Sequence, residues 1–198
     1  MLHLLKSSEN AVALLEWVQQ DPVHAFTESR TLFRRTKDDR DIFYWMENDI
    51  PAAVLCVAYT KGLPDTIDQI LDEASEVADI ADATHAIFYT VFKTDAQTNV
   101  KNPGAKLIRS AAKWIQDNIV NITDFVTMSP IPALTQHFTE PPTREEVSEF
   151  INSHKDPVAK FHLRNGARLR RVIINADSSD KRMTQSFGFM VNYDYTNR

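Results

Sequence analysis

The sequence has a single cysteine, no long apolar run and no excess of positive charge. One cysteine cannot form a disulfide within the chain, and we interpret Cys56, which lies inside the apolar run AAVLCVAY, as a small buried side chain. No stretch is long and apolar enough to span a bilayer, and the start MLHLLKSSEN lacks the basic region and cleavage site of a signal peptide. We therefore predict a cytoplasmic protein with no membrane partner.

Further absences narrow the function. The formal net charge of -5 disfavours a nucleic-acid partner. No histidine is paired with Cys, Asp or Glu at metal-ligand spacing, so we predict no metal, and we interpret His85 as a strand-end residue. Basic residues recur from Arg30 to Arg40, and we interpret this run as a solvated face or a turn around residues 37–39 in preference to a phosphate site.

The patterns that are present predict a single α/β domain. The chain has 198 residues, of which 43% are hydrophobic, and can bury a core. Helical spacing predicts helices over 8–20, 63–77, 103–119 and 143–151, and apolar β-formers predict strands over 41–47, 51–60, 84–94 and 124–128. The first two strands make a hairpin, while the helix from Pro103 connects the last two in parallel, which gives a mixed sheet.

Near the end of the chain, Asn165-Gly166 predicts a second hairpin because both residues tolerate positive φ. Its strands cover 159–164 and 167–175, which places His162 on a strand. The same end is locally basic, which suits a phosphorylated ligand, although an edge strand guarded by charge is an equal alternative. These basic residues are Lys160, Arg164, Arg168, Arg170, Arg171, Lys181 and Arg182.

Two positions stand at the ends of predicted strands. The loop 95–102 leads into the helix that Pro103 opens, a layout that suits phosphate binding, although Pro103 removes one backbone donor. Ser129 ends the strand 124–128, and Pro130 and Pro132 favour extended backbone around it. Its hydroxyl is then held where α/β sheets gather ligands, or it caps the segment that follows.

These residues fall in motifs that resemble a known family, malonyl-CoA decarboxylase. DPVAKFHLRNGA, which contains His162, resembles that family's catalytic histidine motif, and NADSSDKRMTQSFGFMVNYDY resembles its later tyrosine-rich segment. FVTMSPIPAL, which contains Ser129, resembles the family's serine segment, and AIFYTVFKT with GAKLI resembles its strand and cofactor helix. The likeness covers roughly residues 45 to 195 in the right order.

The resemblance implies a GNAT-like acyl-CoA N-acyltransferase fold, a mixed and splayed central sheet flanked by helices, with a thioester in a notch between two strands. It implies Ser129 and His162 as the catalytic pair. It also implies that Asn165, Asn192 and Tyr193 contact substrate and that Asn102, Gly104 and Ala105 bind the cofactor. The parts of the single domain 1–198 are then a helical and basic segment 1–40, a cofactor-binding core 41–138, a surface excursion 139–155 and catalytic strands 156–198.

The chemistry of this pair fits decarboxylation of a malonyl thioester, which needs an oxyanion stabiliser and a proton donor to carbon. The unperturbed pKa of histidine suits His162 as the donor. Ser129 can hold the substrate carboxylate, hold the enolate oxygen or relay the proton. We expect a thioester such as malonyl-CoA or acetyl-CoA as substrate, without metal.

Three readings stay open. The first is a compact decarboxylase. The second is an acyltransferase to an amine, with Tyr193 or Tyr195 as general acid, and the third is a thioester-binding module without turnover. The loop 99–104 keeps a single glycine where the family has several, so an acyl carrier protein is an alternative thiol. A homo-oligomer is compatible with all three readings.

Overall fold

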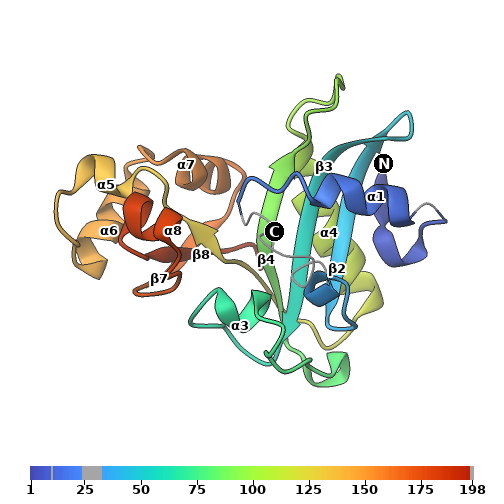
Figure 1. Ribbon diagram of the computed structural model, residues 1–198, viewed down its shortest axis with the longest axis horizontal. Helices are drawn as coiled ribbons and strands as arrows, with labels where there is room; N and C mark the ends of the chain where they lie inside the picture. Colours follow the sequence, from blue (N-terminus) through green and yellow to red (C-terminus); the bar gives the residue numbers. More distant parts are fainter. Residues whose placement is uncertain (10, 24–32, 197–198) are drawn as a thin grey trace.

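Helices flank both faces of one open sheet in the computed structural model, which describes residues 1–9, 11–23 and 33–196 (Figure 1). The strands of the described chain are β1 (Leu2–Leu4), β2 (Arg40–Glu47), β3 (Ile50–Thr60), β4 (His85–Lys93), β5 (Asp124–Thr127), β6 (Ser129–Pro130), β7 (Arg168–Ile173) and β8 (Met190–Asp194). The helices are α1 (Ala11–Val18), α3 (Asp68–Leu71), α4 (Pro103–Asn118), α5 (Leu134–His137), α6 (Arg144–Asn152), α7 (Pro157–Arg164) and α8 (Asp180–Ser186), with short 3₁₀ turns at Leu5–Ser7 and Ile80–Asp82.

The first half of the sheet follows the predicted order. Strands β2 and β3 pair antiparallel as a hairpin, and their connecting residues Asn48 and Asp49 both have positive φ. Strand β4 pairs antiparallel with β3 and parallel with β5, and α4 makes the crossover between β4 and β5. The predicted hairpin, the parallel pair and the crossover helix are therefore confirmed.

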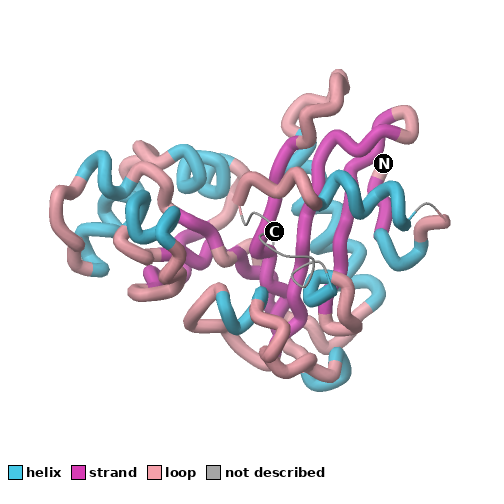
Figure 2. The backbone as a smooth tube through the Cα atoms, viewed as in Figure 1, coloured by secondary structure: helices cyan, strands magenta, loops and turns pink. Residues whose placement is uncertain are grey.

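The sheet splays apart after Phe88. Strand β5 pairs with β4 only from His85 to Phe88, whereas β4 continues to Lys93 beside β3. A register shift at the same place leaves Tyr89 as an extra residue opposite β3, and such a bulge bends a strand away from its neighbour. Beyond this point the other arm of the sheet consists of β6, β7 and β8. Figure 2 shows the two groups of strands, so the predicted splayed mixed sheet is confirmed.

A separate apolar core lies on each face of the sheet. On one face α4 buries Leu107, Ile108, Ala111 and Ile115, and α6 buries Val147, Phe150 and Ile151. On the other face α1 buries Leu14 and Val18. Figure 1 shows α1 crossing in front of the strands and α4 behind them. The place where β4 and β5 part after Phe88 therefore lies between two faces that are covered by different helices.

The predicted strand around His162 is wrong, because Pro157–Arg164 is the helix α7. The side chain of Asp156 caps the start of α7, and Pro157 takes its first position, where a missing N–H has no cost. Asn165 and Gly166 end the helix, and Gly166 has a φ of 92°. An Asn-Gly pair suits a helix end as well as a hairpin, because both need a residue that tolerates positive φ.

The predicted helix over 63–77 is also wrong except for one turn in its middle. Only Asp68–Leu71 is helical, and the Asp72 side chain then accepts the N–H of Ala74. Such local side-chain bonds compete with helix propagation. Val77, the last residue of the expected apolar face, is 45% exposed. Without a buried face, tertiary packing does not support a longer helix.

The basic run is not a solvated face where the structure describes it. Arg34, Arg35 and Arg40 are each only 1% exposed. Arg34 and Arg40 both pair with Asp39, and Arg35 pairs with Asp21. The predicted turn around residues 37–39 is confirmed, since Arg40 donates its N–H to Lys37 O at 3.0 Å. The solvated face is wrong for the three arginines, because charges this deeply buried are stable only when they are paired, and their partners depend on the fold. Residue 30 of the same run and residue 24, one of the histidines, lie outside the described residues.

Among residues 1–9, 11–23 and 33–196, no helix is both long and apolar enough to cross a membrane. The same part of the chain contains no group of three or more His, Cys, Asp or Glu side chains that could hold a metal ion. Cys56 is fully buried, as expected, and burial raises the pKa of its thiol to about 11.

Candidate active site

A cavity of about 400 Å³ occupies the opening between the two arms of the sheet. Its lining comes from both core faces, since Phe88 belongs to the face covered by α4 and Tyr89, Phe92 and Met128 belong to the face covered by α1. The cavity therefore passes through the sheet. The remaining lining residues in the described chain are Val23, Val91, Lys93, Asn102, Pro103, Gly104, Ser129, Pro130, Pro157, Val158, Phe161 and His162.

Ser129 reaches this cavity because the chain leaves β5 and joins the second arm. Met128 still donates its N–H to Phe88 O at 3.0 Å, but Ser129 already pairs with Val191 of β8. Ser129 is 5% exposed and lines the cavity. The serine therefore stands at the branch point of the splay, on the side of the sheet that faces α7.

His162 reaches the cavity from the last turn of α7. Only Ala159 and His162 of this helix are fully buried, and His162 is 3% exposed. The start of α7 is fixed by Asp156, whose Oδ1 accepts the N–H groups of Val158 and Ala159, both at 2.9 Å. Asp156 Oδ2 accepts the N–H of Ala133 at 3.0 Å. One carboxylate therefore ties the helix of His162 to the segment that follows Ser129.

A chain of hydrogen bonds runs through His162. Its Nε2 lies 3.2 Å from Ser129 Oγ, and its Nδ1 lies 2.9 Å from the Tyr195 hydroxyl oxygen. Ser129 Oγ donates to Thr127 Oγ1 at 2.8 Å, and Thr127 Oγ1 also accepts the N–H of Tyr193 at 3.0 Å. Because Ser129 gives its proton to Thr127, its oxygen can accept Nε2–H, while the Tyr195 hydroxyl donates to Nδ1. We therefore assign the single proton of the neutral ring to Nε2.

Burial lowers the pKa of His162 to about 3, because the charged imidazolium loses its hydration in the core. This finding corrects the expectation of a pKa near neutrality. The ring is neutral at physiological pH, so any proton that it delivers is the one it holds on Nε2. A neutral imidazole can act in this way when a second donor supplies its other nitrogen.

This low pKa predicts an acid-sensitive fold. In the unfolded chain the histidine has its ordinary pKa of 6.5, so between pH 6.5 and about 3 only the unfolded state binds the proton. The free energy of unfolding should therefore fall as the pH drops through this range. In His162→Gln the fall between pH 7 and pH 4 should be smaller by on the order of 2 to 3 kcal/mol. Urea unfolding of both proteins at the two pH values measures it, and equal falls would refute the neutral buried ring.

The first turn of α4 borders the same cavity. Asn102, Pro103 and Gly104 line it, and Asn102 adopts a left-handed conformation with a φ of 51°. The N–H groups of Gly104 and Ala105 have no acceptor within the helix, because they belong to its first turn. Asn102 makes no side-chain bond that caps them. Two backbone donors and the positive end of the helix dipole are therefore available to an anion.

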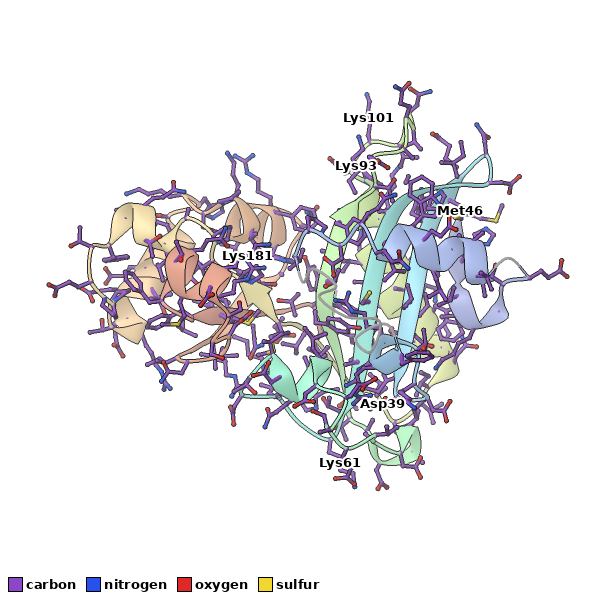
Figure 3. All side chains as sticks on the ribbon, in the orientation of Figure 1. Asp39, Met46, Lys61, Lys93, Lys101 and Lys181 are labelled. Atoms are coloured by element: carbon purple, nitrogen blue, oxygen red, sulfur yellow. The ribbon has the colours of Figure 1, made fainter. Side chains whose placement is uncertain are left out.

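Positive side chains lie at the same end of the molecule. Lys93 lines the cavity, and Figure 3 labels Lys93 and Lys101 at the same end of the view. The Lys106 ammonium lies 5.8 Å from the centre of the Trp45 ring. Lysine ammonium groups next to a helix N-terminus suit phosphate oxygens. The first turn of α4 is therefore the place in this cavity where a phosphorylated cofactor fits best.

The structure does not bring the other predicted substrate residues to the cavity lining. Asn165 ends α7 and donates Nδ2 to Phe161 O at 2.8 Å. Asn192 is fully buried, where it donates to Thr127 O at 2.7 Å and accepts from Arg171. Tyr193 stacks on the His162 ring, with 4.6 Å between ring centres and 21° between planes. These three side chains contact α7, Thr127 and the His162 ring and do not line the cavity.

Sequence reasoning missed residues that position the pair. Thr127 and Ser129 are two apart, as are Tyr193 and Tyr195, so the period of an extended chain places each pair on one face. This spacing of two residues could have indicated that the side chains of each pair meet the same hydrogen-bond network. Asp156 followed by Pro157 is a helix N-cap signature and could have indicated α7.

Comparison with known proteins gives one family. The sequence model of the malonyl-CoA decarboxylase C-terminal domain matches residues 1–155 and 142–198. The mitochondrial malonyl-CoA decarboxylase of Anser anser anser is 26% identical over 241 aligned residues, which cover 88% of this chain and 48% of that protein. The chain thus spans about half the length of this curated relative.

Solved structures show the same fold. Malonyl-CoA decarboxylase from Agrobacterium vitis has a TM-score of 0.84 at 25% identity, and the match covers 99% of this chain and 60% of that chain. The GphF GNAT-like decarboxylase, solved in complex with isobutyryl-CoA, has a TM-score of 0.72 at 15% identity, and the match covers 100% of this chain and 100% of that chain. The predicted GNAT-like fold is therefore confirmed.

Proposed function

This chain belongs to the malonyl-CoA decarboxylase C-terminal domain family, and from that premise we propose that it converts a malonyl thioester into an acetyl thioester and CO2. The observation that carries the proposal is the pair of Ser129 and His162, 3.2 Å apart in the wall of a cavity that passes through the splayed sheet. The thiol is CoA or an acyl carrier protein. The N-terminus of α4 supports CoA, because its free N–H groups and nearby lysines suit a pyrophosphate.

The reaction breaks the bond between Cα and the carboxylate. CO2 leaves, and the bonding electron pair stays on Cα, from where it spreads onto the thioester oxygen as an enolate. We assign to Ser129 a hydrogen bond to this oxygen or to the departing carboxylate. His162 then passes its Nε2 proton to Cα, directly or through the serine, which forms the new C–H bond.

Tyr195 completes the proton balance. As Nε2 loses its proton, Nδ1 receives the proton of the Tyr195 hydroxyl, which lies 2.9 Å away. The ring therefore never carries a negative charge. After the acetyl thioester has formed, Nδ1 returns its proton to the Tyr195 phenolate while one proton from solvent restores Nε2–H, so each turnover consumes one solvent proton. The stack of Tyr193 on the imidazole holds the plane of the ring during this exchange.

The polarity of the network favours decarboxylation over acyl transfer to an amine. An acyltransferase needs a base that removes a proton from its acceptor. Here Nε2 of His162 carries the proton and donates it toward Ser129, and Nδ1 accepts from the Tyr195 hydroxyl, so neither ring nitrogen is an unoccupied base. The acyltransferase and the thioester-binding module remain as outcomes of the test, and the cytoplasmic location stays a prediction from sequence.

Incubation of the protein with malonyl-CoA, followed by mass spectrometry of the thioesters, tests the proposal. We expect acetyl-CoA to accumulate with one equivalent of CO2, and in D2O we expect one deuterium in the new methyl group. A malonyl acyl carrier protein is assayed in parallel, because it is the alternative substrate. Acylation of an added amine without decarboxylation would establish the acyltransferase, and binding without turnover of either thioester would establish the binding module.

A further inference from the structure

The short segment that follows α1 closes the opening of the sheet on the face away from α4. Asp21 Oδ2 accepts from Thr90 Oγ1 of β4 at 3.0 Å and pairs with Arg35 at 2.6 Å. Asp21 Oδ1 accepts the N–H of Val23 at 2.7 Å. We call residues 21–23 the clasp. These contacts fix the clasp to the arm of the sheet that contains β4.

The other arm holds the clasp through α8. Lys181 Nζ donates to Pro22 O at 2.7 Å, and Arg182 Nη2 donates to Val23 O at 2.5 Å. Figure 3 shows Lys181 at the boundary between the two arms. Arg182 is 3% exposed, and its second nitrogen, Nη1, donates to Gln185 Oε1 at 2.7 Å. The clasp is therefore a cross-link between segments about 160 residues apart in sequence.

The clasp contributes a wall to the candidate active site. Val23 lines the cavity together with Tyr89, Phe92 and Met128, which all belong to the face covered by α1. Gly104, where a phosphorylated cofactor fits best, belongs to the helix on the opposite face. A thioester whose phosphates lie at α4 and whose acyl group meets Ser129 and His162 therefore occupies the cavity that Val23 lines from the other face.

We propose that Arg182 sets the acyl selectivity of the site, because it fixes Val23 as the wall that meets the acyl group. The inference rests on the proposed binding of an acyl thioester, but it does not require turnover. With the clasp held, the site favours the unbranched malonyl or acetyl group over groups that carry an α-methyl branch. One methyl group in an apolar pocket changes selectivity by about 10- to 200-fold.

The clasp contacts make the inference testable in two independent ways. Lys181 and Arg182 bind backbone carbonyls, so the side chain of Val23 can be exchanged without the loss of either bond. Val23→Ala enlarges the acyl end while the clasp stays in place. Arg182→Gln and Arg182→Lys keep the Val23 side chain but remove or alter the bond that holds it.

Binding of CoA, acetyl-CoA and isobutyryl-CoA to the whole protein is measured by titration calorimetry, because none of the three has an acyl carboxylate to lose. We expect Arg182→Gln and Val23→Ala each to shift the ratio of Kd values by about 10-fold toward isobutyryl-CoA, with the Kd of CoA changed less than twofold. Arg170→Gln is the matched control, since Arg170 pairs with Asp124 outside the cavity lining. Circular dichroism establishes that each variant is folded.

The outcomes separate this inference from the proposed function. If the wild-type protein does not decarboxylate malonyl-CoA but the Kd ratio shifts, the selectivity role stands and the decarboxylase is refuted. An unchanged ratio in a folded Arg182→Gln would overturn the role of Arg182, even for an active decarboxylase and even if Val23→Ala shifts the ratio. Arg182→Lys keeps a donor for Val23 O and should stay closer to the wild-type ratio than Arg182→Gln. Equal weakening of CoA and both acyl-CoAs would also overturn it, because it would mean general loosening of the fold.

Discussion

Replacing His162 with glutamine is expected to lower kcat for malonyl-CoA decarboxylation by about 100- to 10,000-fold, with a much smaller change in KM. In the proposed mechanism the imidazole gives a proton to the carbanion, and glutamine cannot pass a proton between two nitrogens. Substrate binding depends mainly on the cavity wall and on the first turn of α4, which the substitution leaves unchanged. Steady-state release of acetyl-CoA measures both constants.

A second histidine provides the matched control. His137 is exposed at the end of α5 and stacks on Phe150, outside the cavity lining. His137→Gln should therefore keep kcat within about twofold of the wild type, as is usual for surface substitutions away from the site. If His162→Gln lost no more activity than His137→Gln, His162 would have no part in the proton transfer.

The position of Ser129 follows from local sequence, whereas that of His162 does not. Pro130 and Pro132 keep the chain extended, so the end of a strand at Ser129 can be read from the local sequence. The place of Ser129 between the two arms depends on its pairing with β8. His162 required the resemblance to a family, because the Asn165-Gly166 pair that follows it suits two different structures. The fully buried positions of α7 are Ala159 and His162, while Val158, Phe161 and Leu163 are partly buried against the core. One alanine and one histidine make a weak apolar period, so the N-cap signature of Asp156 and Pro157 is the clearer local indication of the helix.

The chemistry of the site depends on contacts that no local pattern encodes. Tyr195 and Thr127 meet around His162 only because β5 and β8 are neighbours in the sheet. The pKa of His162 depends on complete burial, which is a property of the whole fold. The same holds for Arg182 and Val23, which touch across the opening of the sheet. The sequence therefore predicted the serine and the histidine of the candidate site. The protonation state of the histidine and the hydrogen-bond partners of both residues follow from the tertiary structure.

The side chain of Asp156 links the helix that carries His162 to the segment that follows Ser129. Its Oδ1 caps the helix that positions His162, and its Oδ2 binds the N–H of Ala133, four residues after Ser129. The carboxylate is fully buried, and desolvation raises its pKa despite three backbone donors. A rigid link of this kind fixes the distance between Ser129 and His162 more directly than the general packing of α7 does.

Asp156→Asn is accordingly expected to lower the free energy of unfolding by about 1 to 3 kcal/mol, because the amide can keep the cap but meets the Ala133 N–H with a second donor. The same change should lower kcat by about 10- to 100-fold, since small misplacements of a catalytic group are costly. Thr143→Ala is the control, because it removes the cap of α6 at a similar cost of about 1 kcal/mol without touching the site. Urea unfolding and steady-state kinetics of both variants measure the two effects. Equal kcat values in the two variants would mean that Asp156 contributes stability alone, and that His162 is positioned by its stack on Tyr193 and its bond to Tyr195.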